Sequence, residues 1–169
     1  MGVLNITPDS FFNNSRFNEL DSLTRKIKDF SDSDIIDIGA ESTRPNSKPL
    51  NVKHELDRLD IVFNNMDLFH DKILSIDTYK PEVAKKALEH GFSILNDIYG
   101  GKNSEMFTLA ADFSTKIIIM HINGDPETMQ RHIRYNNLID DIIAYFEKQV
   151  SCALDIGVDE SNIILDPGI

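Results

Sequence analysis

The sequence has little of several features that define particular classes of protein. It contains one cysteine, Cys152, and no tryptophan. A single cysteine excludes an internal disulfide framework and fits a reducing compartment, so we expect a cytoplasmic protein. Cys152 falls within a helical pattern, and we predict that it fills space in the core rather than acting as a reactive thiol.

Long apolar runs and clustered positive charge are also absent. No run approaches the roughly 20 apolar residues that a membrane helix needs, and no charged region precedes a signal-like stretch at the N-terminus. The formal net charge is -11, from 28 acidic and 17 basic residues. Nucleic-acid binding needs clustered Lys and Arg, so we expect neither nucleic acid nor a membrane as a partner. An anionic substrate would need local positive groups or a metal ion.

The sequence does contain a repeated unit, in which an apolar run ends in a polar residue and a loop. In Asp34–Pro45, three isoleucines surround Asp37, and the run breaks at Gly39 into a polar loop. Buried strands that end in polar side chains are typical of active sites in α/β proteins. The same unit recurs in KILSIDTYKP, FSILNDIYGG, KIIIMHINGDP and NIILDPG.

Strand and helix patterns alternate along the whole chain. Five amphipathic helices are expected, around residues 20–30, 52–63, 81–90, 104–113 and 136–156, the last with Ile139 and Ile143 facing inward. Strict alternation predicts a parallel sheet with right-handed crossovers. Six strands are predicted: Met1–Ile6, Asp34–Ala40, Lys72–Asp77, Ser93–Asp97, Lys116–His121 and Asn162–Asp166.

The distribution of polar strand ends separates two α/β architectures. An open doubly wound sheet concentrates its site at one switch point, whereas all strand ends of a barrel face one mouth. Nearly every strand end here is polar, which favours the barrel. A (β/α)8 TIM barrel has eight strands and typically ~250 residues. We therefore expect residues 1–169 to form one partial TIM-barrel domain of about six strands and five helices, truncated after the sixth strand.

Six loop motifs, taken in order, resemble those of dihydropteroate synthase. They are MGVLNITPDSF at 1–11, DIGAESTRP at 37–45, SIDT at 75–78, ND at 96–97, MHINGDPETMQ at 120–130 and LDPG at 165–168. The resemblance runs from the first residue to the last. It implies a pterin-binding enzyme of folate biosynthesis. In that family, 6-hydroxymethyl-7,8-dihydropterin diphosphate condenses with 4-aminobenzoate to give 7,8-dihydropteroate and diphosphate.

The resemblance implies that Asp77, Asn96 and Asp166 bind the pterin, with Ile98 and Met120 as apolar walls. The amino edge of a pterin presents two adjacent N–H donors, which a carboxylate can accept in a fork. An amide can serve an edge that mixes donor and acceptor. Asp77 is also one of two expected catalytic residues, because it would stabilise the cation-like ring as diphosphate departs.

The resemblance assigns further residues to the diphosphate and to 4-aminobenzoate. Asn5 would hold Mg²⁺, a hard cation that also binds the diphosphate, and Thr43 would contact the diphosphate. Two loops that close over 4-aminobenzoate, and over sulfonamides, would contain Phe11, Thr43, Arg44 and Pro45. Arg44 is the second expected catalytic residue.

Two positions depart from the family pattern. Asn13 stands where the family has a carboxylate, and an amide cannot supply negative charge; Asn46 stands for a glycine. The family's later Lys and Arg-x-His, and the helices of its homodimer interface, would lie beyond Ile169. We therefore expect this chain alone to be inactive. Glu55 and Arg58 fit the family's pattern at the start of the second helix; the alternative interpretation, from their i, i+3 spacing, is a surface ion pair of small value.

Two other functions remain open at this point. A methyltetrahydrofolate–corrinoid methyltransferase shares the pterin-binding Asp and Asn, but it lacks the STRP loop and the NITPDSF strand. A non-catalytic pterin-binding relative is favoured only by Asn13.

Overall fold

The structure is a computed structural model of the chain, and it describes residues 1–7, 16–41, 49–122 and 137–168. The described part contains six strands and five α-helices in strict alternation, as predicted. Short 3₁₀ helices at Met66–Phe69 and Glu160–Asn162 precede β3 and β6. In chain order the elements are β1 (Gly2–Asn5), α2 (Arg16–Asp29), β2 (Ile35–Gly39), α3 (Val52–Phe63), β3 (Ile73–Asp77), α4 (Pro81–Glu89), β4 (Ile94–Asp97), α5 (Glu105–Asp112), β5 (Lys116–Met120), α6 (Leu138–Ile156) and β6 (Ile163–Asp166).

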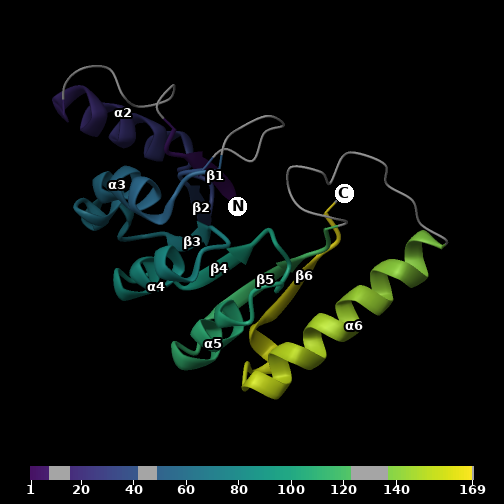
Figure 1. Cartoon of the computed structure of the whole chain (residues 1–169). Coiled ribbons are helices and arrows are strands. Elements are labelled where there is room, and N and C mark those ends of the chain that lie inside the picture. Colours follow the sequence, from purple (N-terminus) through teal and green to yellow (C-terminus); the bar gives the residue numbers. More distant parts are fainter. Residues whose placement is uncertain (8–15, 42–48, 123–136, 169) are drawn as a thin grey trace.

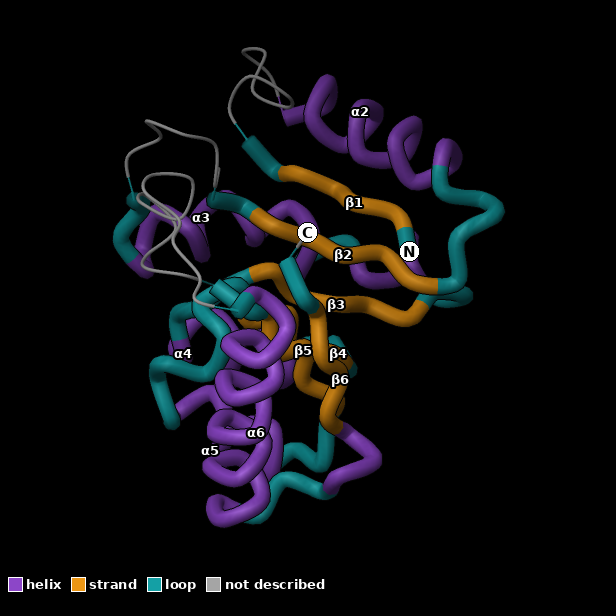
Figure 2. The backbone as a smooth tube through the Cα atoms, turned by 90° about the vertical axis from the view of Figure 1, so that its right-hand side faces the viewer, coloured by secondary structure: helices purple, strands orange, loops and turns teal. Residues whose placement is uncertain are grey.

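All six strands are parallel and form one sheet in the order β1-β2-β3-β4-β5-β6. An open doubly wound sheet would reverse its strand order at a switch point, and this sheet does not. The strands follow one another around a curved layer, with helices outside it (Figures 1 and 2). Within the described residues, β1 and β6 each pair on one side only, so the barrel is open between them. The prediction of an incomplete TIM barrel is confirmed.

The core lies between the sheet and the helices. Parallel strands covered by helices read as continuous apolar runs, and in β2 to β5 the residues facing the helices are almost fully buried. Complete burial of one such side chain contributes about 1.5–3 kcal/mol. The buried residues on this face include Leu4, Ile36, Ile38, Leu74, Ile76, Leu95, Ile117 and Ile119.

The helix ends follow local rules. The Asn51 side chain accepts a hydrogen bond from the backbone N–H of His54 at 2.9 Å and so caps α3. Pro81 is the first residue of α4, where a missing N–H costs nothing. Gly157 ends α6 in the left-handed conformation, with φ 108°. None of the helices in the described part is long and apolar enough to cross a membrane.

Two predictions from the sequence about helix α6 are wrong. Cys152 is exposed rather than core filler, and Ile139 and Ile143 are 62% and 50% exposed. The buried residues of α6 are Gln149 and Ala153. The first turns of α6 extend away from the sheet (Figure 1), so its apolar periodicity continues where no described element covers it.

Candidate active site

The two faces of the sheet differ in chemistry. Side chains alternate between faces along a strand, and paired residues on neighbouring strands share a face. The face under the helices is apolar. Near the carboxyl ends of the strands, the opposite face has a set of polar side chains: Asp37, Ser75, Asp77, Asn96 and Asp166.

Strands β2 and β4 are joined by a side-chain contact across this polar face. Nδ2 of Asn96 donates a hydrogen bond to Oδ2 of Asp37 at 2.9 Å. The two strands are not neighbours, because β3 lies between them. The contact therefore depends on the curvature of the sheet, which brings strand ends toward one place. Asp37 is only 4% exposed, so this hydrogen bond is largely shielded from water.

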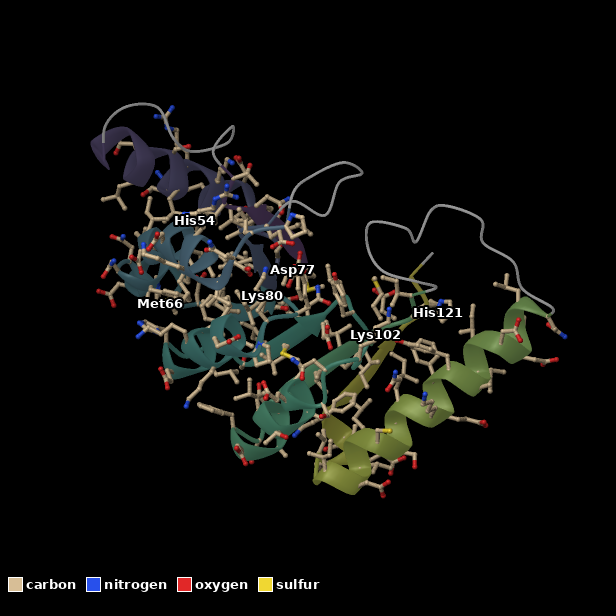
Figure 3. All side chains as sticks on the ribbon, viewed as in Figure 1. His54, Met66, Asp77, Lys80, Lys102 and His121 are labelled. Carbon is tan, nitrogen blue, oxygen red and sulfur yellow. The ribbon has the colours of Figure 1, made fainter. Side chains whose placement is uncertain are left out.

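Asp77 lies at the end of β3, between Gly39 on β2 and Asn96 on β4 in the register. A Cβ atom at Gly39 would lie 3.0 Å from Oδ2 of Asp77. The missing side chain thus gives the carboxyl group room on this face. Figure 3 shows Asp77 near Lys80, and His121 farther away, beside α6.

The pKa values of two carboxyl groups of the site, Asp77 and Asp37, are raised. Burial, followed by the negative charge of Asp37, raises the pKa of Asp77 to about 8; Glu55, Glu41 and Asp97 add smaller contributions. Burial also raises the pKa of Asp37, although the hydrogen bond from Asn96 acts to lower it. A pKa of about 8 favours the protonated form of Asp77 at neutral pH, and a cationic or N–H-donating ligand would favour release of that proton.

Beside this polar face, Lys80 joins two carboxylates that the sequence does not bring together. Its Nζ donates to Glu41, at the end of β2, and to Glu55, on α3. Burial acts to lower the pKa of Lys80, but these hydrogen bonds outweigh it and raise the pKa above its usual range. Glu55 also accepts from Thr78 Oγ1 at 2.7 Å. We call Glu41, Glu55, Thr78 and Lys80 the rim cluster.

The rim cluster overturns the expectation for Glu55 and Arg58. Glu55 is 1% exposed, and its partners are Lys80 and Thr78. Nη1 of Arg58 instead donates to the backbone oxygen of Ala40 at 2.7 Å. Spacing along a helix predicted a surface pair, but both side chains turn toward neighbouring loops. Arg58 therefore braces the end of β2, and Glu55 braces the loop after β3.

The other predicted site residues lie at the same rim where the structure describes them. Asn5 is exposed at the end of β1 and pairs with Gly39. Met120 and Asp166 pair at the ends of β5 and β6, and both are partly buried, as is Ile98. Oδ1 of Asp166 accepts from the backbone N–H of Gly168 at 2.9 Å.

The remaining predicted residues lie outside the described part of the chain. They are Phe11, Asn13, Thr43, Arg44, Pro45 and Asn46. Their roles in binding and catalysis therefore stay predictions.

Sequence reasoning missed Asp37 and Lys80 as parts of the site. Asp37 precedes Gly39 by two residues, and period-two alternation already puts both on one face. The signal for Asp37 was therefore present in the sequence. Lys80 gave no comparable signal, because its partners come from separate elements.

The residues present fit Mg²⁺ only as a partner of a phosphorylated ligand. No group of three or more His, Cys, Asp or Glu side chains that could hold a metal ion is found among the described residues. Asn5 offers one exposed amide oxygen, a hard donor suited to an ion that keeps several waters and binds substrate phosphates. The described residues alone do not offer enough such donors to hold a metal ion without a ligand.

A sheet of this topology, with carboxyl and amide groups gathered at its carboxyl-terminal rim, is typical of α/β-barrel proteins, which bind small ligands at this rim. The sequence model described as "Pterin binding enzyme" matches residues 1–169. The chain belongs to this family.

Individual relatives agree with the family. The chain is 41% identical to the dihydropteroate synthase of Synechocystis sp., covering 100% of this chain and 60% of the relative. The Clostridium difficile dihydropteroate synthase, crystallised in the presence of pteroic acid, superposes with a TM-score of 0.88 at 35% identity, covering 100% of this chain and 63% of that one. The Thermus thermophilus enzyme in complex with 4-aminobenzoate gives a TM-score of 0.79 at 38% identity, covering 100% and 60%. The chain thus spans about 60% of the length of these relatives.

Proposed function

We propose that the protein is a dihydropteroate synthase. It joins 6-hydroxymethyl-7,8-dihydropterin diphosphate to 4-aminobenzoate and releases diphosphate. The observation that carries the proposal is the set of carboxyl and amide groups at one rim of a barrel sheet, on a chain that the pterin-binding family matches from end to end. Relatives crystallised with pteroic acid and with 4-aminobenzoate support these substrates.

The pterin lies against the polar face of the sheet. One carboxyl oxygen of Asp166 accepts a hydrogen bond from the backbone N–H of Gly168. The second oxygen accepts from the amino edge of the ring. Asn96 and Asp77 contact the remaining ring edge, while Ile98 and Met120 cover its faces. A wrong ring would leave buried polar groups unpaired, which makes such a site selective.

The reaction exchanges one bond at the pterin methylene carbon. The C–O bond to diphosphate breaks and takes its electron pair with the leaving group. The amine nitrogen of 4-aminobenzoate then forms the C–N bond and loses a proton. No nucleophile of the protein takes part. Asp77 stabilises the electron-poor ring once it has given up its proton, which the positive charge on the ring favours.

Three further roles follow the family resemblance. Mg²⁺, when bound, neutralises charge on the departing diphosphate, and Asn5 is the residue that would hold it. Thr43 contacts the diphosphate. Phe11, Arg44 and Pro45 enclose 4-aminobenzoate, and the guanidinium of Arg44 stabilises developing negative charge.

The test uses the protein expressed from its whole reading frame. We expect dihydropteroate and diphosphate to form in equal amounts from the two substrates with Mg²⁺, and Asn96→Ala to reduce the rate at least tenfold. Glu89→Gln, an exposed change on α4, is the matched control. Pterin binding without turnover would instead indicate a non-catalytic relative, and methyl transfer from methyltetrahydrofolate would indicate the corrinoid-dependent class. Absence of pterin binding would contradict the proposal altogether.

We further propose that the whole protein is a cytoplasmic homodimer and that residues 1–169 alone are inactive. Sedimentation of both forms, together with the same assay, tests these points. A full catalytic rate from residues 1–169 would contradict the second.

A further inference from the structure

Asn96 is held by one hydrogen bond whose direction is fixed. Its Nδ2 lies 2.9 Å from Oδ2 of Asp37, and a carboxyl oxygen in this position can only accept. If Asp37 is protonated, the same direction holds while the proton resides on Oδ1, next to Ser75. Neither Oδ1 of Asp37 nor Oγ of Ser75 has a hydrogen-bond partner among the described residues.

The bond decides which part of the Asn96 amide faces a ligand. An amide group can rotate by half a turn and exchange its oxygen for its NH2 group. With Nδ2 bound to Asp37, that rotation would bring two oxygen acceptors together. Asn96 is only partly buried, and none of the described residues donates to its Oδ1. The oxygen is therefore free to accept from a ligand, while the second hydrogen of Nδ2 can donate.

We propose that Asp37 is a positioning residue that orients Asn96, and that the oriented amide selects the dihydro state of the pterin ring. This inference rests on the proposed function. In a 7,8-dihydropterin, N1 accepts a hydrogen bond and the adjacent N8–H donates one. The amide of Asn96 offers the complementary donor and acceptor side by side. In the fully oxidised pterin, N8 carries no hydrogen and accepts, so it faces the oxygen of Asn96 without a proton between them.

The position of Asp37 suits the orientation of Asn96 rather than direct contact with the ligand. It lies two residues before the end of β2, paired with Ser75, below the row that contains Asp77 and Asn96. At 4% exposure it has little surface with which to touch a ligand. A buried partner that determines the orientation of a binding group acts through that group.

The test compares binding of 6-hydroxymethyl-7,8-dihydropterin and 6-hydroxymethylpterin to the protein expressed from its whole reading frame, by calorimetry without oxygen. We expect wild type to bind the dihydro form about tenfold more tightly, the effect of one mismatched hydrogen bond. Asp37→Ala should reduce this preference to within about twofold. Glu89→Gln, the exposed control on α4, should retain it.

A double-mutant cycle separates positioning from general damage. If Asp37 acts through Asn96, the double variant Asp37→Ala/Asn96→Ala should bind no more weakly than Asn96→Ala. Asp37→Leu, which fills the space but offers no acceptor, replaces Asp37→Ala if the latter does not fold. Without ligand, the side-chain amide NMR signals of Asn96 should shift in the Asp37 variants and not in Glu89→Gln.

Three results would overturn the inference. They are an unchanged dihydro preference in both Asp37 variants, additive losses in the cycle, and wild-type binding of both ring states with equal affinity. If wild type binds neither ring, the proposed function fails as well, whereas binding without an effect of Asp37 removes the inference alone.

Discussion

The two faces of the sheet contribute differently to the protein, one to stability and the other to ligand binding. Ile76 and Ser75 are neighbours on β3, and both are fully buried. Ile76 packs under the helices, while the hydroxyl of Ser75 faces the polar side and has no hydrogen-bond partner among the described residues. One face gains stability by excluding water. The other keeps buried polar groups with incomplete pairing, which is costly without a ligand. Along a single strand, alternate residues thus contribute to stability and to ligand binding.

The sharpest test of this comparison changes one residue on each face of β3. Ile76→Ala should lower the free energy of unfolding by about 3 to 4 kcal/mol, because it leaves a cavity in the core. Ser75→Ala removes an unpartnered hydroxyl and should change it by less than about 1 kcal/mol. Urea unfolding measures both. Equal losses in the two variants would contradict the division of labour between the faces.

The rim cluster allows the next test, since it stabilises charges rather than apolar area. Lys80→Met leaves Glu41 and Glu55 facing each other without a cation and should cost about 2 to 3 kcal/mol. Lys53 and Asp57 form an exposed ion pair on α3, so Lys53→Met is the matched control. We expect it to leave the urea midpoint unchanged. A stable Lys80→Met protein would show that the carboxylates of the rim cluster take up protons or water instead.

The raised pKa of Asp77 also predicts how the stability of the protein depends on pH. The pKa of Asp77 is raised to about 8 by burial and by Asp37, Glu55, Glu41 and Asp97. The folded state therefore binds a proton that the unfolded state releases at lower pH. Its contribution to stability is complete below the unfolded pKa and is lost as pH rises through about 8. The melting temperature should fall by a few degrees between pH 6 and pH 9.

Asp77→Asn removes the group responsible and serves as the comparison. Its melting temperature should change less than that of wild type over the same range. Because a pterin with N–H donors favours the ionised carboxyl, binding at pH 7 should also release a proton from wild type and not from Asp77→Asn. Calorimetry in two buffers of different ionisation enthalpy measures this release. Parallel pH profiles of the two proteins would contradict the assignment to Asp77.

Much of the fold was readable from the sequence because local rules and periodicity agree. Apolar runs ending in Asp77 and Asn96 gave both the strands and the common rim. Periodicity could not show that the first turns of α6 extend past the sheet, so Ile143 was wrongly placed inward. A pattern reports which residues share a face. It does not report whether another element covers that face.

The site was harder to predict where it depends on contacts between distant segments. Glu55 looked like half of a surface pair, since spacing on α3 brings it next to Arg58. Its burial follows from Thr78 and Lys80, which approach from another loop. The Asp37–Asn96 contact skips a strand, so it follows from sheet curvature, for which the sequence has no local signal.

The smallest change in the free energy of unfolding is expected for Gly39→Ala, which adds a single methyl group to the polar face. A Cβ atom there would lie 3.0 Å from Oδ2 and 3.3 Å from Cβ of Asp77, so Asp77 must shift by a few tenths of an ångström. Alanine also restricts the unfolded chain, which favours folding by about 0.4–1 kcal/mol. These effects oppose each other, and Gly39→Ala should change the free energy of unfolding by less than about 1 kcal/mol. Pterin affinity, however, should fall several-fold, because the displaced carboxyl group no longer meets the ring.

Gly91 provides the opposite control. It has φ 93° and no atom within 4 Å of an added Cβ, so Gly91→Ala introduces backbone strain without a clash. It should cost about 1 kcal/mol and leave pterin affinity unchanged. Urea unfolding and calorimetry should show that Gly91→Ala loses stability but keeps its pterin affinity. Gly39→Ala should lose pterin affinity but keep its stability. If Gly39→Ala binds pterin as wild type does, Asp77 is not held in place by the space at Gly39, and the polar face tolerates more movement than its close packing implies.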